Sequence, residues 1–132
     1  MTIQVRQTSL SASEAAIRSH RVMIDRPTDK GGTDIGPMGG ELFLAAVGGC
    51  FLSNLLAAIQ SRNVDVTDVQ AEVTGVIEGS PARFSRIEIV VSAGCADREL
   101  FEKLVEIAER GCIMMSTLRG MIDLNVRVPE HA

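Results

Sequence analysis

The stretch between residues 36 and 62 constrains the fold of this chain most, because it carries almost no charge. It opens with Gly36-Pro37 and one carboxylate, Glu41, and no further charged residue follows until Arg62. Its large apolar side chains are spread around every face of a helix with 3.6 residues per turn. We therefore predict a helix over Glu41–Ser61 that is buried on all sides.

The same run is long enough to be considered as a membrane span. Two features argue against that interpretation: polar and glycine residues dilute the run, and no cluster of Lys or Arg precedes it. We therefore expect the buried helix of a soluble protein with no membrane contact. A single domain of this size can hardly surround such a helix, whereas a second copy of the chain could, so we expect a homodimer.

Length and composition narrow the class of protein further. The 132 residues fit one domain, residues 1–132. Aromatic residues make up 3%, Trp and Tyr are missing, and the net charge is −4. Stacking surfaces and phosphate-binding charge are therefore scarce, and we expect no nucleic-acid partner. No export signal precedes Ser9, and three Cys without scaffold spacing fit a reducing environment, so we expect a cytoplasmic location.

The remainder of the chain predicts strands and further helices. Alternating or β-branched runs predict an edge strand in Thr2–Thr8 and strands over His20–Asp25, Val64–Ile77, Phe84–Ser92 and Ile122–Val128. The state of Ser9–Ser19 stays open, and Arg26–Gly40 is a loop rich in Gly and Pro. A change of apolar phase near Thr67–Asp68 predicts a bulge. The runs on either side of residues 78–81 predict an antiparallel hairpin.

Two further helices are expected after that hairpin. An apolar stripe predicts a helix over Arg98–Arg110, which Asp97 can cap and Gly111 can end. A second short helix is expected within Cys112–Arg119. The fold class is therefore α+β, with an antiparallel sheet on one side of the helices.

Cys50 and Cys112 are the residues with the clearest chemical potential. Each follows a Gly, precedes an apolar residue, and lies in or beside a predicted helix. Two interpretations stay open: free Cys is often simply a small buried hydrophobe, and two such residues could also form a redox pair. Cys95 lies at a loop-to-helix junction, where we expect it to be a bystander.

Other kinds of site have little support in the sequence. The Cys residues are far apart, His20 is the only internal His, and neither a C-x-x-C nor an H-x-x-x-H spacing occurs, so no metal site is expected. There is no G-x-S-x-G for a serine hydrolase and no phosphate-binding glycine loop.

A nucleophilic Cys50 would need help to ionise, because a thiol in apolar surroundings has a raised pKa and is inert. The predicted helix offers no cation around it. We therefore look to Arg18, Arg21 and Arg26, which precede the loop leading to the helix, although each could equally be a solvated surface charge. Glu41 could hold such an arginine through a paired contact.

Several short blocks together resemble the OsmC/Ohr family. They are Asp25 followed by Arg26-Pro27, Gly31-Gly32, Gly36-Pro37, Glu41-Leu42 and Gly49-Cys50, and then Cys112 within ERGCIMMSTL. The resemblance covers most of the chain. It implies an intertwined homodimer with the Cys-bearing helices at its centre, an OsmC-like fold that agrees with a helix buried on all sides.

The resemblance also implies a function, because characterised members of that family are thiol peroxidases for organic hydroperoxides. Cys50 would be the peroxidatic residue and Cys112 the resolving one. Arg21 or Arg26 would stabilise the Cys50 thiolate, and Glu41 would orient that arginine. No bound cofactor is implied. The reductant would be an external dithiol, such as a lipoylated protein, or a small thiol.

The sequence departs from the best-characterised peroxidases at two positions. Gly40 stands where their catalytic Glu does, ten residues before the first Cys, and Ile113 follows the second Cys, where Pro is frequent. The segment around His20 resembles a less-studied branch. Apolar residues such as Phe43 and Phe51 would suit bulky alkyl peroxides. A non-enzymatic dimer that binds an apolar small molecule or senses redox state remains the alternative, beside a structural dimer with inert Cys.

Overall fold

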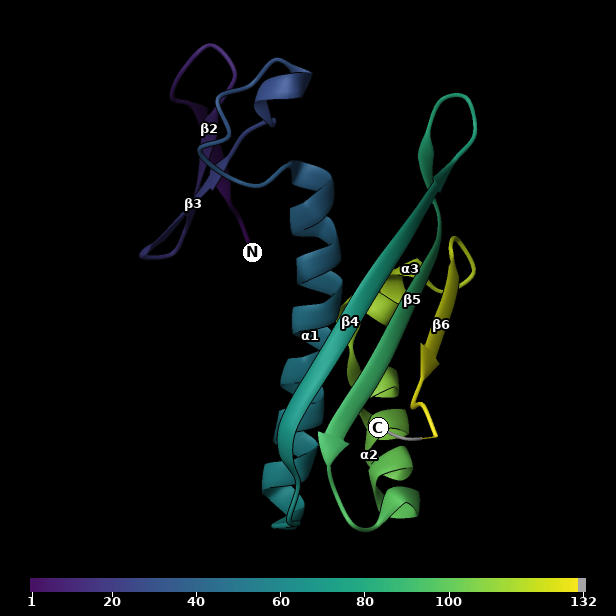
Figure 1. Cartoon of the computed structure of the whole chain (residues 1–132). Coiled ribbons are helices and arrows are strands. Elements are labelled where there is room, and N and C mark those ends of the chain that lie inside the picture. The colour runs from purple at the N-terminus through teal and green to yellow at the C-terminus, as the bar shows by residue number, and fades with distance from the viewer. Residues whose placement is uncertain (131–132) are drawn as a thin grey trace. The chain divides into compact units, whose positions relative to one another are not determined.

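The computed structural model describes residues 1–130, and the chain forms two compact units, residues 1–43 and the residues from Leu44 onward. Helix α1 (Gly39–Arg62) begins in the first unit and continues through the second (Figure 1). The predicted α+β class is confirmed. The strands of the described residues form two three-stranded sheets, however, where the sequence predicted one.

The first unit contains an antiparallel sheet of β1 (Gln4–Gln7), β2 (Ser13–Ile17) and β3 (His20–Ile24). Strands β1 and β3 lie where the sequence predicts them, and β2 occupies the segment 9–19 that the sequence left open. The small side chain of Ala15, at the centre of β2, is buried. The sequence did not predict β2, because this Ala-rich segment shows no alternation of apolar and polar residues.

The loop after β3 is organised by the buried carboxylate of Asp25. It accepts hydrogen bonds from the Arg26 N–H (2.7 Å), the Thr33 N–H (3.0 Å) and the Thr33 hydroxyl (2.6 Å). The Thr33 hydroxyl in particular holds the pKa of Asp25 well below its usual range. A 3-10 turn, η1 (Thr28–Lys30), lies between these partners, and Gly32 packs so closely on Arg26 that a Cβ would overlap its carbonyl oxygen. The Asp and Gly-Gly of this segment therefore shape the loop.

The second unit contains β4 (Thr67–Glu78), β5 (Arg83–Gly94) and β6 (Asp123–Arg127), with α2 (Arg98–Gly111) and α3 (Ile113–Leu118) between β5 and β6. The antiparallel β4–β5 hairpin is confirmed. The predicted antiparallel sheet is present in the β4–β5 pairing, and the structure adds β6, which pairs parallel to β5. The connection through two helices is long enough to bring the chain back in the same direction, which a tight turn could not do.

Two local predictions in this unit are also confirmed. The β4–β5 pairing shifts register between Thr67 and Gln70, at the predicted bulge, and Asp68 there has a φ of 52°. The Asp97 carboxylate caps α2 by accepting the Leu100 N–H at 3.0 Å. Strand β4 begins at Thr67, later than the Val64 that the sequence suggested, and the irregularity lies within its first residues.

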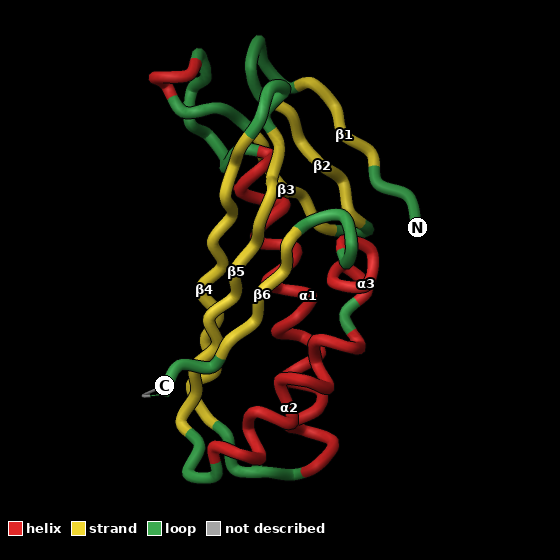
Figure 2. The backbone as a smooth tube through the Cα atoms, turned by 90° about the vertical axis from the view of Figure 1, so that its right-hand side faces the viewer, coloured by secondary structure: helices red, strands yellow, loops and turns green. Residues whose placement is uncertain are grey.

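All three helices of the second unit lie on the same side of its sheet (Figure 2). Gly48 in α1 lets the helix approach β4 closely, since a Cβ there would come within 2.6 Å of Val73 Cγ2. The core between the helices and the sheet is apolar. Its fully buried large side chains are Val47, Phe51, Leu55, Ile87, Ile89, Val91, Leu104 and Met115, with Cys112 among them.

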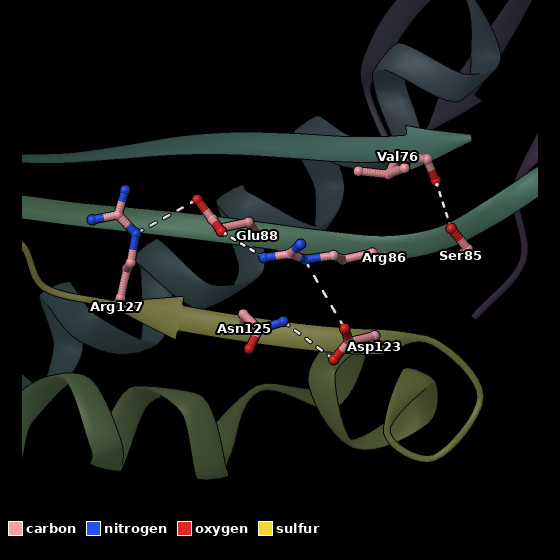
Figure 3. A network of polar contacts seen from close by, with 7 residues as sticks. All are labelled: Val76, Ser85, Arg86, Glu88, Asp123, Asn125 and Arg127. Atoms are coloured by element: carbon pink, nitrogen blue, oxygen red, sulfur yellow. Dashed lines mark hydrogen bonds and ion pairs between the residues drawn. The ribbon is translucent and has the colours of Figure 1, made fainter. Parts of the chain in front are cut away.

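Ion pairs occupy the other face of this sheet, where Arg86 and Glu88 alternate with the buried residues of β5 (Figure 3). Arg86 contacts Glu88 at 3.0 Å and Asp123 at 4.0 Å, and Arg127 contacts Glu88 at 3.5 Å. These side chains are partly exposed, so each pair contributes at most about 1 kcal/mol. The Arg86–Asp123 and Arg127–Glu88 pairs join β6 to β5 across the parallel pairing.

Within one chain, helix α1 is buried on one side only, which agrees with the expectation that a single domain of this size can hardly surround it. Val47, Phe51 and Leu55 face the core, and the opposite face is exposed. That exposed face carries the small or polar residues Ala45, Ala46, Gly49, Ser53, Ala57 and Gln60 and one large apolar side chain, Leu56. By length and composition alone the helix could cross a membrane, a test that the core helix of a soluble protein also passes.

Candidate redox site

Cys50 and Cys112 come together in the second unit. Cys50 lies near the middle of α1, and Cys112 is the single residue that joins α2 to α3. The Cys112 thiol donates a hydrogen bond to Cys50 Sγ, with 3.1 Å between the two sulfur atoms. Both thiols are free, Cys112 is fully buried and Cys50 is partly exposed. The two candidate residues are thus adjacent, and the one that a substrate could reach is Cys50.

The surroundings of Cys50 favour its ionised form. Desolvation opposes ionisation, but hydrogen bonds from the Cys112 thiol and from the backbone N–H groups of Met114 and Ile113 outweigh it and lower the pKa of Cys50. These N–H groups belong to the first turn of α3, where backbone donors have no partner within the helix. The sequence predicted that a cation would be needed, whereas the structure already supplies backbone and thiol donors.

The surroundings of Cys112 act in the opposite direction. Burial raises the pKa of Cys112, and its hydrogen bond and charge interaction with Cys50 raise it further, while N–H groups of Met115 and Met114 offset part of the effect. The pair is therefore unequal, with a thiolate favoured at the exposed member and a thiol at the buried one. In such a pair, the Cys50 thiolate can attack an electrophile while Cys112 stays protonated.

A polar side chain that the sequence analysis did not single out lies beside the pair. Asn54 follows Cys50 by one helical turn, and its amide nitrogen donates to the Cys50 carbonyl oxygen at 2.9 Å and lies 4.0 Å from Cys50 Sγ. Its amide oxygen faces Gly111, where a Cβ would lie 3.1 Å away. The signal that could have found it is an Asn in an otherwise apolar helix, four residues after a Cys.

The other predicted site residues lie in the first unit. Arg21 projects from β3, contacts Glu14 at 3.5 Å and donates to the carbonyl oxygen of His20. Glu41 accepts the Met38 N–H at 2.8 Å at the start of α1. Arg26 is exposed, and within the described residues 1–43 no ion pair joins Glu41 to Arg21 or Arg26. A role for these residues at Cys50 stays a prediction.

Cys95 lies elsewhere, at the start of the connection between β5 and α2. Its thiol donates to the Asp97 carbonyl oxygen at 3.3 Å. It borders a cavity of about 160 Å³ beside Arg98, whose guanidinium is occupied by the Val128 and Pro129 carbonyl oxygens. Among residues 1–130, no group of three or more His, Cys, Asp or Glu side chains is arranged to hold a metal ion.

Comparison with known proteins identifies a related family. The family model described as OsmC-like protein matches residues 31–127. That range includes both α1 and α3, and therefore both Cys50 and Cys112. No curated protein matches the chain.

Solved structures share the fold at low sequence identity. An OsmC-like protein from Mycoplasma pneumoniae superposes with a TM-score of 0.83 at 17% identity, covering 97% of this chain and 94% of that one. A candidate osmotic stress induced and detoxification response protein from Psychrobacter arcticus reaches 0.84 at 18% identity, covering 98% and 96%. The organic hydroperoxide resistance protein OhrB of Bacillus subtilis reaches 0.68 at 22% identity, with 98% of each chain covered.

Proposed function

Because the chain belongs to the OsmC-like protein family, we propose that it reduces organic hydroperoxides with Cys50 and Cys112 as its redox pair. The observation that carries the proposal is the 3.1 Å contact between the two sulfur atoms. The opposite shifts of the two pKa values support the division of labour between them. Structural neighbours named for organic hydroperoxide resistance agree with this class of substrate.

In the first half-reaction, the Cys50 thiolate attacks the terminal oxygen of the hydroperoxide. The O–O bond breaks, the alkoxide takes a proton from water and leaves as the alcohol, and Cys50 keeps the transferred OH as a sulfenic acid. Two electrons pass from the sulfur to the peroxide. The N–H groups of Ile113 and Met114 and the thiol of Cys112 favour the reactive thiolate form before attack.

In the second half-reaction, Cys112 attacks the Cys50 sulfur, a disulfide forms and water leaves. The short distance between the sulfur atoms and the burial of Cys112 favour this internal capture over capture by a solvent thiol. An external dithiol, such as a lipoylated protein, or a small thiol then returns both Cys to the reduced form. No bound cofactor takes part in this scheme.

We further propose that Arg21 or Arg26 adds to the stabilisation of the Cys50 thiolate and that Glu41 orients that arginine. In the single chain Arg21 faces Glu14, and Glu41 contacts the Met38 N–H. The proposal therefore requires that one of these arginines leave its present partners when substrate or a second chain is bound. The backbone donors at Cys50 make this contribution an addition and not a requirement.

We propose that the protein is a homodimer and that it works in the cytoplasm. Proteins of this family are dimers. The exposed face of α1, with Gly49 and Ser53 at its centre, is suited to close approach by a second α1, because small side chains let two backbones come near. A second chain on this face would also remove the exposed Leu56 side chain and its neighbouring alanines from water.

A steady-state assay tests the proposed function. With cumene or tert-butyl hydroperoxide and a dithiol such as dihydrolipoamide, wild type should consume peroxide and dithiol in equal amounts, and Cys50→Ser should be inactive. Cys95→Ser is the matched control and should retain the wild-type rate. If wild type forms the disulfide but does not turn over with any dithiol, the protein is a redox sensor and the enzymatic proposal is wrong.

A further inference from the structure

Asn54 is an unusual residue in its place. From Leu42 to Ile59 the helix is otherwise composed of apolar and small residues, with Ser53 as the other polar one. Asn is a poor helix former, because its amide competes for backbone groups. It is half-buried and lies on the same side of α1 as Cys50, one turn further along. Neither core packing nor helix stability explains an Asn at this position.

The contacts of Asn54 connect it to the redox pair. Its amide nitrogen donates to the Cys50 carbonyl oxygen at 2.9 Å and reaches to 4.0 Å from Cys50 Sγ. An amide nitrogen carries two hydrogens, so one can serve the carbonyl oxygen while the other faces the sulfur. The hydrogen bond to the Cys50 carbonyl oxygen fixes the amide in place, and the more distant Cys50 sulfur is the nucleophile.

The opposite edge of the amide meets the end of α2. The amide oxygen is directed at Gly111, and a Cβ at that position would lie 3.1 Å from it, closer than most side chains tolerate. Gly111 does not adopt a positive φ, and the following Cys112 has a φ of −80°, so the backbone conformation does not require a glycine. The space that the Asn54 amide occupies explains why residue 111 is a glycine.

We propose that Asn54 is a positioning residue for Cys50, and that Gly111, directly before Cys112, is a glycine because it leaves room for the Asn54 amide. The amide holds a donor beside the sulfur from the side of α1, while Ile113 and Met114 provide donors from α3. This inference rests on the proposed function only in taking Cys50 as the reactive nucleophile.

The test measures the pH dependence of Cys50 alkylation by iodoacetamide, followed on the Cys50 peptide by mass spectrometry. Cys112, the titratable group that contacts Cys50, stays in place in every variant. Loss of a weak donor in Asn54→Ala should raise the midpoint by about half a pH unit. Asn54→Asp should raise it more, because a carboxylate would repel the thiolate. Asn125→Ala, which removes an exposed asparagine on β6, is the matched control and should leave it unchanged.

A double-mutant cycle separates this role from general damage to the fold. Gly111→Ala should raise the midpoint in wild type, because the new methyl group displaces the amide, and should add nothing in the Asn54→Ala background. Gly111→Ala leaves Asn54 in place and introduces alanine, a good helix former. This variant therefore remains informative if Asn54→Ala fails to fold. An unchanged midpoint in folded Asn54→Ala, or an equal effect of Gly111→Ala in both backgrounds, would overturn the inference.

Alkylation involves no peroxide, so the two proposals fail separately. Absence of peroxide turnover with a normal Asn54 effect would refute the proposed function alone. Normal turnover with no Asn54 effect would refute this inference alone.

Discussion

The thiol of Cys112 donates a hydrogen bond to Cys50 Sγ at 3.1 Å, across 62 positions of sequence. The same short segment that supplies this thiol also supplies the N–H groups of Ile113 and Met114 that act on Cys50. One element thus favours the thiolate of Cys50 and holds the residue that would later capture its oxidised form. The geometry of α3 relative to α1 is therefore the feature on which the proposed chemistry depends most.

Removing the thiol donor should make Cys50 less acidic. In wild type, the lowered pKa of Cys50 should place the midpoint of its alkylation below that of an ordinary exposed thiol, and Cys112 should react only at higher pH. In Cys112→Ala the midpoint for Cys50 should move upward, since a hydrogen bond to the thiolate is lost. Cys112→Ser keeps an O–H donor and should lie between the two. Identical profiles in all three proteins would contradict the assigned role of Cys112.

Arginine substitutions test the proposed contribution of charge. Replacing Arg21 or Arg26 by Met should raise the apparent pKa of Cys50 and slow its alkylation at pH 7, if one of them stabilises the thiolate. Arg6→Met, on strand β1 of the same sheet as Arg21, is the matched control and should have no effect. Should neither Arg21→Met nor Arg26→Met change the rate, the donors from α3 and Cys112 suffice, and the arginine proposal is wrong.

The dimer prediction depends on the exposed face of α1. Wild type should sediment as a folded dimer at low micromolar concentration. Gly49→Glu places a charge on the exposed face of α1 and should yield monomers. Within one chain the new side chain fits, because a Cβ at Gly49 would have no other atom within 4 Å. Gly48→Ala should instead lower thermal stability, because its Cβ would collide with Val73 on the core side of the helix. A stable wild-type monomer would remove the basis for the dimer.

Much of this fold follows from sequence patterns, and the exceptions have physical reasons. The boundaries of α1, the β4–β5 hairpin, the bulge near Asp68 and the Asp97 cap depend on local chemistry and periodicity. The direction of β6 depends on a crossover through two helices. Its alternating apolar residues predict a strand but do not indicate whether that strand pairs parallel or antiparallel. Strand β2 lacked the alternation that marks a half-buried strand.

The site could be predicted only in part for a related reason. The matching contexts of Cys50 and Cys112 made them candidates, but the donors around Cys50 are backbone groups, which carry no side-chain signature. The role of Asn54 depends on the space left by Gly111, which requires the packing of α2 against α1. Sequence reasoning therefore looked for a charged side chain where main-chain N–H groups are present.

Asp25 should make the loop before α1 sensitive to acid. Its pKa is lowered in the folded chain, so its ionised form stabilises the fold above the unfolded value of about 3.9, and that contribution is lost as the pH falls toward the folded value. Asp25→Asn should melt at lower temperature than wild type at pH 7, and the difference should shrink below about pH 4. Asp29→Asn, on the exposed η1 turn, is the control. Equal melting temperatures at pH 7 would contradict the role of Asp25.

The most direct test of the redox pair is mass mapping after treatment with one equivalent of cumene hydroperoxide. Free thiols should fall from three to one per chain, one equivalent of alcohol should form, and the linked peptides should hold Cys50 and Cys112 with Cys95 free. In Cys112→Ser, Cys50 should stop at the sulfenic acid and over-oxidise with excess peroxide. A disulfide that includes Cys95, or peroxide consumption with all three thiols intact, would contradict the assignment of Cys50 and Cys112.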